Sequence, residues 1–407
     1  MDGEELNLDI LKTLTKPSNT KIVLLVLDGL GGIPDEENGL TELEAAYTPN
    51  LDKLAYQGIC GLQQPVASGI TPGSGPGHLS LFGYNPFEYQ VGRGVLAAYG
   101  IGFELLDGDV AARGNFCTID ENNIILDRRA GRIPTEENKK LCRILQENID
   151  IEGVEVFVET VKEHRLLLVL RGEGLSGDLH DTDPQETGKP PLPPQATSPR
   201  GEKTKGIIEE FLRQARNILK DHHPANMILL RGFSQKPKWP SIQETYKLRG
   251  AAIAVYPMYR GLAKLLGMDI LDTGETISEE FQTLEEHWER FDFFYIHIKK
   301  TDSSGEDGDF DRKKSIIEEV DQEIPRLLEL KPDVIIVTGD HSTPSMLKAH
   351  SWHPVPLLLW SKNVCRDNVK HFGERECING SLGPRFPGVE IMPLALAHAG
   401  RLEKFGA

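Results

Sequence analysis

Four short apolar runs along the chain predict buried β-strands. The runs cover residues 22–27, 293–298, 334–337 and 355–360. They are rich in valine, isoleucine and leucine and show no alternation of apolar and polar positions, which is typical of parallel strands covered on both faces. We therefore expect all four to be buried strands of one parallel sheet.

Two longer stretches have helical rather than strand spacing. Apolar side chains recur every three or four positions through 207–219 and again through 316–328, as on the buried face of an amphipathic helix. Helices interleaved with short apolar strands indicate an α/β sandwich built around a mostly parallel sheet.

The middle of the chain has a more varied pattern. It contains one expected strand at 166–170, an Asp-Gly turn at 107–108 and five prolines between positions 190 and 199 that predict a loop. The simplest interpretation is a smaller inserted domain at 92–233, which divides the α/β core into residues 1–91 and 234–407.

Composition narrows the range of partners. A net charge of −17 over 407 residues argues against binding to nucleic acid or to an anionic membrane, although a local arginine cluster could still hold a small phosphorylated substrate. The five scattered cysteines form no CxxC pair, which fits a reducing compartment and argues against a thiolate zinc site. The acidic start lacks the features of a signal peptide, and no apolar run is long enough to span a bilayer. We expect a cytoplasmic protein, either a monomer or a small homo-oligomer.

Aspartate and histidine border the expected strands. Asp28 ends the first run, Asp302 follows the second, Asp340 and His341 follow the third, and His350 precedes the fourth. Ligands of open α/β sheets bind outside the carboxyl ends of strands, and carboxylates together with imidazoles can hold divalent cations. Each residue taken alone also fits a simple turn, but together they predict one metal-binding edge of the sheet. For the nearby His353 a loop role is the favoured interpretation.

Ser74 lies in the glycine-rich segment TPGSGPGHLSLFGY, with Gly73 and Gly75 on either side and His78 four positions later. A glycine-rich segment alone is often only a loop. Beside the strand-end ligands it has a chemical use, because metal coordination can make a serine hydroxyl nucleophilic. Two cations can also stabilise a phosphoryl group during in-line displacement.

The chain resembles the alkaline phosphatase superfamily and, within it, the archaeal-type 2,3-bisphosphoglycerate-independent phosphoglycerate mutases. Segments spread over nearly the whole chain carry the resemblance, among them VLLVLDGLGG, TPGSGPGHLSLFGY, GRGVLAAYGIG, DRRAGRI, DTDP and GDHSTP. The resemblance implies an alkaline-phosphatase-like three-layer sandwich with a smaller inserted α+β domain. It also implies interconversion of 3-phosphoglycerate and 2-phosphoglycerate, a step of glycolysis and gluconeogenesis, through a phosphoserine on Ser74.

The resemblance further implies two divalent cations, for which we expect manganese, with zinc, magnesium or cobalt as alternatives. One cation would be held by Asp28, Ser74, Asp340 and His341, and the other by Asp302, Glu306 and His350. The inserted domain would exclude water and hold phosphoglycerate through arginines, whose planar groups bind carboxylate and phosphate bidentately. The residues assigned to substrate are His78, Arg93, Arg113, Arg128, Arg129, Arg132, His164, Arg165 and Lys299. A surface position for any one of these arginines, and a solvated side chain for Lys299, are the alternatives.

Two departures from the family pattern fall in the site itself. Glu306 stands where the family usually has histidine, so the second site could prefer a harder metal, could use Asp307 instead, or could bind weakly. Gly75 replaces the acidic residue usual after the nucleophile. Asp181 and Asp183 could act as acid or base, but a turn role is favoured.

Three other functions are alternatives. A metal-dependent phosphatase, or a mutase of another phosphorylated hydroxy acid, would keep the same core, while a non-catalytic homologue would only bind an acidic metabolite or a protein. Retention of Ser74 and of the strand-end aspartates favours an enzyme, and the water-excluding insert favours the mutase.

Overall fold

The computed structural model describes residues 8–406 and divides the chain into two compact units. The larger unit contains the residues up to Gln90 and from Trp239 onward, and the smaller unit is Val91–Lys238. The insert expected at residues 92–233 falls within the smaller unit. No helix among the described residues has the length and apolar character needed to cross a membrane.

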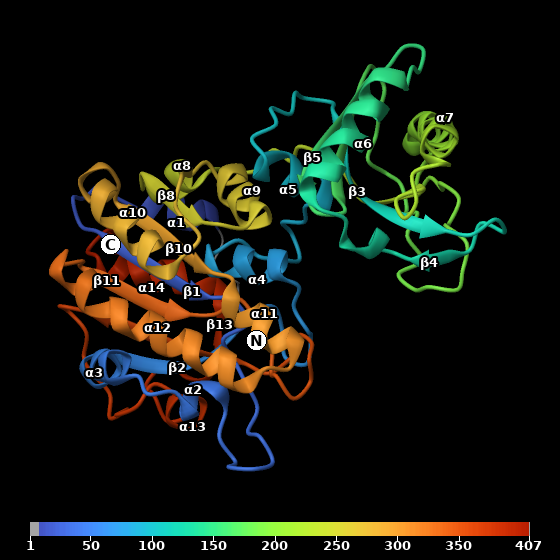
Figure 1. Ribbon diagram of the computed structural model, residues 1–407. Coiled ribbons are helices and arrows are strands. Elements are labelled where there is room, and N and C mark those ends of the chain that lie inside the picture. The colour runs from blue at the N-terminus through green and yellow to red at the C-terminus, as the bar shows by residue number, and fades with distance from the viewer. Residues whose placement is uncertain (1–7, 407) are drawn as a thin grey trace. The chain divides into compact units, whose positions relative to one another are not determined.

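The larger unit is built on an eight-stranded sheet (Figure 1) with the order β13-β2-β12-β11-β1-β10-β8-β9. Most neighbouring strands are parallel, as expected, but β12 runs antiparallel to both β11 and β2. The expectation that the run at 355–360 is a parallel strand is therefore wrong. The strands are β1 (Ile22–Leu27), β2 (Ile59–Gln64), β8 (Gly250–Ala254), β9 (Asp269–Leu271), β10 (Phe293–Ile298), β11 (Val334–Thr338), β12 (Val355–Ser361) and β13 (Gly383–Pro387).

Helices cover both faces of this sheet, which confirms the three-layer α/β sandwich. Alternate residues of β1, such as Val23 and Leu25, enter an apolar core with side chains of α3, α10 and α12, and α10 and α12 cross this face in Figure 1. On the opposite face, Tyr259 of α9 stacks on His297 of β10. All six residues of β1 are buried, which explains the unbroken apolar run. The helices are α1 (Leu8–Leu14), α2 (Glu42–Ala45), α3 (Pro49–Gln57), α4 (Ser74–Leu81), α8 (Ile242–Tyr246), α9 (Pro257–Leu265), α10 (Ile277–His287), α11 (Lys300–Asp307), α12 (Phe310–Glu329), α13 (Glu374–Cys377) and α14 (Ile391–His398).

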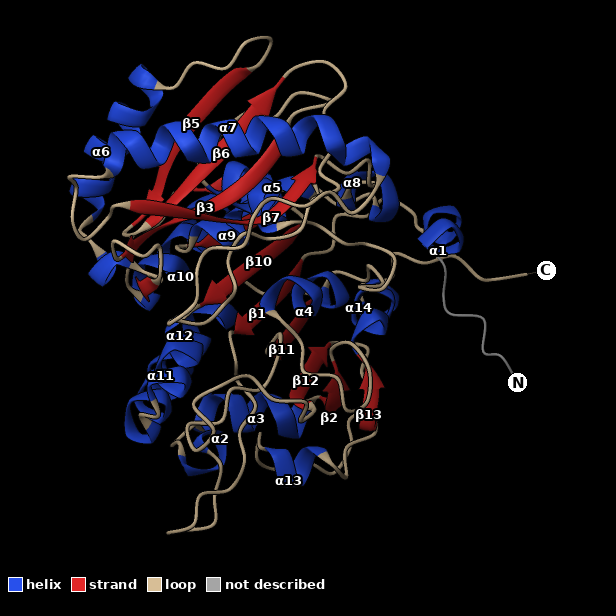
Figure 2. Ribbon diagram, turned by 90° about the vertical axis from the view of Figure 1, so that its right-hand side faces the viewer, coloured by secondary structure: helices blue, strands red, loops and turns tan. Residues whose placement is uncertain are grey.

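The smaller unit is an antiparallel α+β structure. Four of its strands follow the order β4-β3-β6-β5, and a further strand, β7, pairs antiparallel with β3. Helices α6 and α7 share one apolar core with the sheet and lie across its strands in Figure 2. The elements are α5 (Arg93–Gly100), β3 (Val110–Ile119), β4 (Ile125–Asp127), α6 (Thr135–Asn148), β5 (Glu155–Lys162), β6 (Arg165–Arg171), α7 (Glu202–Leu219) and β7 (Met227–Gln235).

The strand register of the larger unit brings several chain segments to one edge of the sheet. Strands β10, β1 and β11 are parallel neighbours, and Leu27 lies opposite Ile298 while Val26 lies opposite Thr338. The residues that follow these strands therefore emerge side by side. Because β12 is antiparallel to β11, with Val337 opposite Leu358, its start lies at the same edge. The antiparallel direction of β12, which the sequence did not predict, therefore places the segment before this strand at the site.

Candidate active site

Asp28, Asp340 and His341 meet where β1 and β11 end. The Nε2 atom of His341 lies 3.3 Å from Asp28 Oδ1 and 3.2 Å from Asp340 Oδ2, and all three side chains are fully buried. Neither of those two carboxylate oxygens has a hydrogen-bond partner among the described residues. Their oxygens and the imidazole nitrogen are close enough together to bind a single metal ion.

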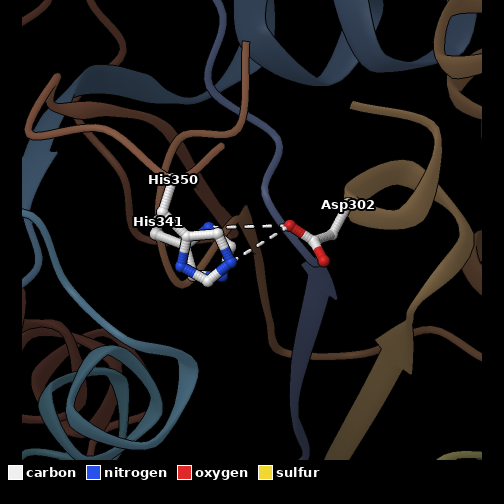
Figure 3. A group of neighbouring side chains, drawn as sticks. All are labelled: Asp302, His341 and His350. Carbon is white, nitrogen blue, oxygen red and sulfur yellow. Dashed lines mark ion pairs between the residues drawn. The ribbon is translucent and has the colours of Figure 1, made fainter. Parts of the chain in front are cut away.

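Asp302, His341 and His350 form a second such group (Figure 3). Asp302 Oδ1 lies 3.5 Å from His350 Nε2 and 4.0 Å from His341 Nδ1. The two imidazole rings stack with their centroids 3.6 Å apart. The structure thus brings together all five ligands that border the expected strands, and His341 contributes to both groups.

Ser74 is the first residue of α4, and its Oγ lies 3.3 Å from His341 Nε2. The helix approaches the first ligand group closely, because a Cβ atom at Gly77 would come within 2.2 Å of the Asp340 carbonyl oxygen. A glycine is therefore required one turn into the helix for the serine hydroxyl to reach the ligands.

Lys299 places its ammonium group between the two ligand groups. Its Nζ lies 3.1 Å from Asp28 Oδ2 and pairs still more closely with Asp302 Oδ2. Burial lowers the pKa of Lys299, but Asp28 and Asp302 raise it by more, so the net shift of this pKa is upward. The lysine thus holds a positive charge at the point where carboxylates from two strands converge.

The same charges act on the ligands. Burial raises the pKa of Asp28, yet Lys299 and the two histidines beside it bring that pKa well below its usual value. Burial lowers the pKa of His341, but the surrounding carboxylates, chiefly Asp340, raise it to about 9. A site that attracts a proton this strongly also favours a metal cation, which can neutralise the same carboxylates.

A layer of aromatic and imidazole side chains supports the first ligand group from behind. His297 Nε2 lies 3.0 Å from Asp28 Oδ2, and Tyr259 stacks on the His297 ring at 3.6 Å. His78 Nδ1 lies 2.8 Å from the Ser74 carbonyl oxygen and 3.1 Å from Asp340 Oδ2. Because His78 is fully buried, a place among these supports suits it better than the substrate contact expected from the sequence.

Glu306 lies at the margin of the second ligand group. Its Oε1 is 3.9 Å from His350 Nε2, and its side chain is 54% exposed. Asp307, the alternative weighed from the sequence, lies instead 4.0 Å from Arg312. His353 Nδ1 contacts the Ser351 hydroxyl at 3.0 Å and belongs to neither ligand group.

The arginines assigned to substrate lie in the smaller unit, where several gather around one histidine. His164 is buried, and burial together with four nearby arginines lowers its pKa to about 3. The four are Arg113, Arg129, Arg132 and Arg165. They form a concentrated positive region, which is the chemistry needed to bind a doubly anionic molecule.

Three other arginines of the smaller unit, Arg93, Arg128 and Arg231, have different surroundings. Arg128 forms a two-point hydrogen bond with Asp183, at 2.9 and 2.6 Å, and Arg231 pairs with Asp181 at 3.3 Å. Arg93 begins α5 and is exposed. Both aspartates of the DTDP segment are thus engaged in ion pairs.

Three side chains at the site were not expected from the sequence: His297, Tyr259 and Thr343. His297 lies within an apolar strand, and its position two residues before Lys299 is the only signal of a role. Tyr259 comes from α9, which no site motif marks. Thr343 is part of the GDHSTP segment, but its contacts depend on a loop conformation that spacing does not show.

Comparison with known proteins identifies similar chains over almost the full length. A family described as 2,3-bisphosphoglycerate-independent phosphoglycerate mutase matches residues 55–226. A protein of Thermosipho melanesiensis, named a probable 2,3-bisphosphoglycerate-independent phosphoglycerate mutase, is 55% identical over 98% of both chains. A protein of Aquifex aeolicus with the same name is 53% identical over 98% of this chain and 100% of its own.

Two solved structures share the fold. One is a protein of Pyrococcus horikoshii, with a TM-score of 0.83 and 32% identity over 95% of this chain and 99% of its own. The other is titled a cofactor-independent phosphoglycerate mutase from Thermoplasma acidophilum, with a TM-score of 0.71 and 33% identity over 94% of this chain and 100% of its own. Both similarities extend through the two units described above.

Proposed function

The chain belongs to the family of 2,3-bisphosphoglycerate-independent phosphoglycerate mutases, and we propose that it carries out their reaction through Ser74 and two divalent cations. The family reaction is an isomerisation that interconverts 3-phosphoglycerate and 2-phosphoglycerate. The observation that carries the proposal is that Ser74 Oγ lies 3.3 Å from His341 Nε2, the nitrogen that also faces Asp28 and Asp340.

The residues present suit two divalent cations. The Asp28 and Asp340 oxygens that face His341 are buried and form no hydrogen bond among the described residues, and buried carboxylates are costly unless positive charge lies beside them. We assign one cation to Asp28, Asp340, His341 and Ser74, and the other to Asp302, His350 and Glu306. When bound, such cations favour the ionised form of the serine hydroxyl and stabilise charge on a phosphoryl group.

Carboxylate and imidazole ligands without thiolates accommodate manganese well. Glu306, in place of a histidine, adds a hard oxygen ligand to the second site. We therefore propose manganese as the working metal, and we keep the expected cytoplasmic location as a prediction.

In the first chemical step, Ser74 Oγ attacks the phosphorus of 3-phosphoglycerate. Oγ gives up its proton as the new Oγ–P bond forms, the bond from phosphorus to the substrate oxygen breaks, and the released glycerate oxygen takes up a proton to become a hydroxyl. In the second step the other glycerate hydroxyl gives up its proton and attacks the phosphorus of the phosphoserine. The Oγ–P bond then breaks, and Ser74 Oγ takes a proton back. Lys299 provides a fixed positive charge beside the phosphoryl group in both steps, which stabilises the charge that develops.

Retention of glycerate between the two steps separates a mutase from a phosphatase. If water reached the phosphoserine first, the products would be glycerate and phosphate. We assign the holding of glycerate to the arginine cluster of Arg113, Arg129, Arg132 and Arg165, because guanidinium groups bind carboxylates in a fixed orientation.

A product assay tests this proposal. Purified protein with Mn²⁺ and 3-phosphoglycerate, and without added 2,3-bisphosphoglycerate, should form 2-phosphoglycerate and release little free phosphate. Phosphate release at a comparable rate without 2-phosphoglycerate would identify a phosphatase instead. Equal results for the wild type and Ser74→Ala would show that Ser74 is not the nucleophile.

A further inference from the structure

Thr343 lies between the two ligand groups and contacts a member of each. Its hydroxyl donates to Asp302 Oδ1 at 2.6 Å and lies 3.0 Å from His341 Nδ1. The threonine is fully buried, so no water competes for its hydroxyl. It is therefore the side chain through which Asp302 and His341 are joined by hydrogen bonds.

The backbone around Thr343 holds this hydroxyl in place. The Thr343 amide donates to the carbonyl oxygens of Gly29 and Gly31 at 3.2 and 3.0 Å, and its own carbonyl accepts from the buried ammonium of Lys313 at 2.9 Å. Gly29 has φ +65° and leaves room for the contact, because a Cβ atom there would lie 2.5 Å from Thr343 Oγ1. The position is thus fixed from the β1 side and from α12.

Counting protons settles the direction of these hydrogen bonds. A threonine hydroxyl has one proton, and the hydroxyl of Thr343 donates to Asp302 Oδ1. The Thr343 proton is therefore used on Asp302 Oδ1, and the contact with His341 requires that Nδ1 carry a proton and donate. In neutral imidazole this leaves the lone pair on Nε2, the nitrogen that faces Asp28, Asp340 and Ser74.

We propose that Thr343 is a positioning residue that fixes His341 with its proton on Nδ1 and so assigns His341 to the Asp28–Asp340 site. This inference rests on the proposed two-metal function. It removes an ambiguity, since His341 is near enough to contribute to either ligand group. It also leaves Asp302 and His350 to the other site, where Glu306 is the remaining nearby carboxylate. Because one hydroxyl holds a ligand of each site, losing it weakens both.

The test measures binding of Mn²⁺ alone, with free manganese followed by electron paramagnetic resonance during titration. The wild type should bind two ions. Thr343→Val keeps the shape but removes the hydroxyl, and should lose on the order of 10- to 100-fold in affinity at both sites, the usual effect of removing a hydrogen bond to a metal ligand. Thr343→Ser restores the hydroxyl and should bind close to the wild type. Thr283→Val is a matched control, because the Thr283 hydroxyl bonds to Glu279 and Thr273 within the α10 region, and it should change nothing.

Nitrogen-15 spectra of the histidines in Zn²⁺-loaded protein give a second readout that does not depend on affinity. The His341 signal, identified by its loss in His341→Gln, should show a protonated Nδ1 in the wild type and in Thr343→Ser. Wild-type manganese affinity in a folded Thr343→Val would overturn the inference. So would a loss of about 10-fold or more in a folded Thr343→Ser relative to the wild type, an outcome that remains decisive if the valine variant does not fold. Failure of the wild type to bind manganese would instead remove the proposed function, and this inference with it.

Discussion

Replacing Lys299 by methionine should destabilise the metal-free protein far more than the manganese-loaded protein. The change keeps the length of the side chain but removes the ammonium that lies 3.1 Å from Asp28 Oδ2 and contacts Asp302. Two buried carboxylates then lose their shared positive partner. Divalent cations bound to the same carboxylates would supply the missing charge.

The size of the effect follows from the geometry. Unit charges 3.1 Å apart attract with about 5 kcal/mol at an effective dielectric constant near 20, and breaking a buried pair by removing one partner costs about 3–5 kcal/mol. For a unit of this size, roughly 2 °C of melting temperature corresponds to 1 kcal/mol. We therefore expect the melting temperature of Lys299→Met in a chelator to fall by about 6–10 °C.

Thermal melts of the wild type and the variant, with chelator or with saturating Mn²⁺, provide the measurement. Removing the ammonium also removes a competing cation, so manganese should raise the melting temperature more in the variant than in the wild type. Lys300→Met is the matched control, because Lys300 is exposed and should change stability by less than about 0.5 kcal/mol. An equal loss of melting temperature with and without metal would show that Lys299 and the cations do not balance the same carboxylates.

Three further substitutions test the nucleophile, the second cation site and an ion pair of the smaller unit. Ser74→Ala should abolish both mutase activity and the phosphoprotein seen by intact-mass analysis after mixing with substrate; a persistent phosphoprotein would place the nucleophile elsewhere. Glu306→His should keep or improve metal loading and shift preference toward Zn²⁺, measured by competition between metals, whereas loss of all binding would give Glu306 a different role. Burial raises the pKa of Asp183, but its hydrogen bond with Arg128 and other contacts hold that pKa below the usual value. The stabilisation is thus present above the unfolded pKa of about 3.9 and is lost as pH falls through the lower folded value. Asp183→Asn should accordingly be less stable than the wild type at pH 7, with the difference narrowing below about pH 4 in denaturant titrations; a gap that stays constant with pH would contradict this.

Apolar patterning predicted the central strands because their environment is uniform. The expected runs at 22–27 and 293–298 coincide with β1 and β10, since every side chain in them is buried. Strand direction could not be predicted in the same way. A strand buried on both faces reads alike in either direction, so β12 was wrongly expected to be parallel.

The metal-ligand group could be predicted to the extent that it depends on strand ends. Asp28 directly follows β1 and Asp340 follows β11 by two positions, so the parallel pairing of these strands brings the two carboxylates together. Asp302 lies four positions after β10, in the first turn of α11, at the same edge of the sheet. Contacts that depend on the conformation of a loop could not be predicted from the sequence. Thr343 reaches Asp302 only through the path of the loop after β11, and the burial of His78 behind Asp340 depends on how α4 packs against the ligands.

The ion-pair partners within the smaller unit also could not be predicted from the sequence. The DRRAGRI segment contains three arginines, and no spacing rule shows that Arg128 pairs with Asp183 while Arg129 and Arg132 lie near His164. A cluster of like charges is costly in a folded protein unless an anionic ligand compensates it. Arg129 and Arg132, which lie near His164, are therefore the ones to test first for substrate affinity.

In the proposed site two cations lie beside Ser74, held by side chains from the segments that follow β1, β10 and β11 and from the segment before β12. Crystals grown with Mn²⁺ and measured at the manganese absorption edge test it most directly. Two anomalous peaks are expected, one contacting Asp28, Asp340 and His341 and the other contacting Asp302 and His350. Density in which these side chains hold no manganese, with the metal bound elsewhere on the chain, would contradict it.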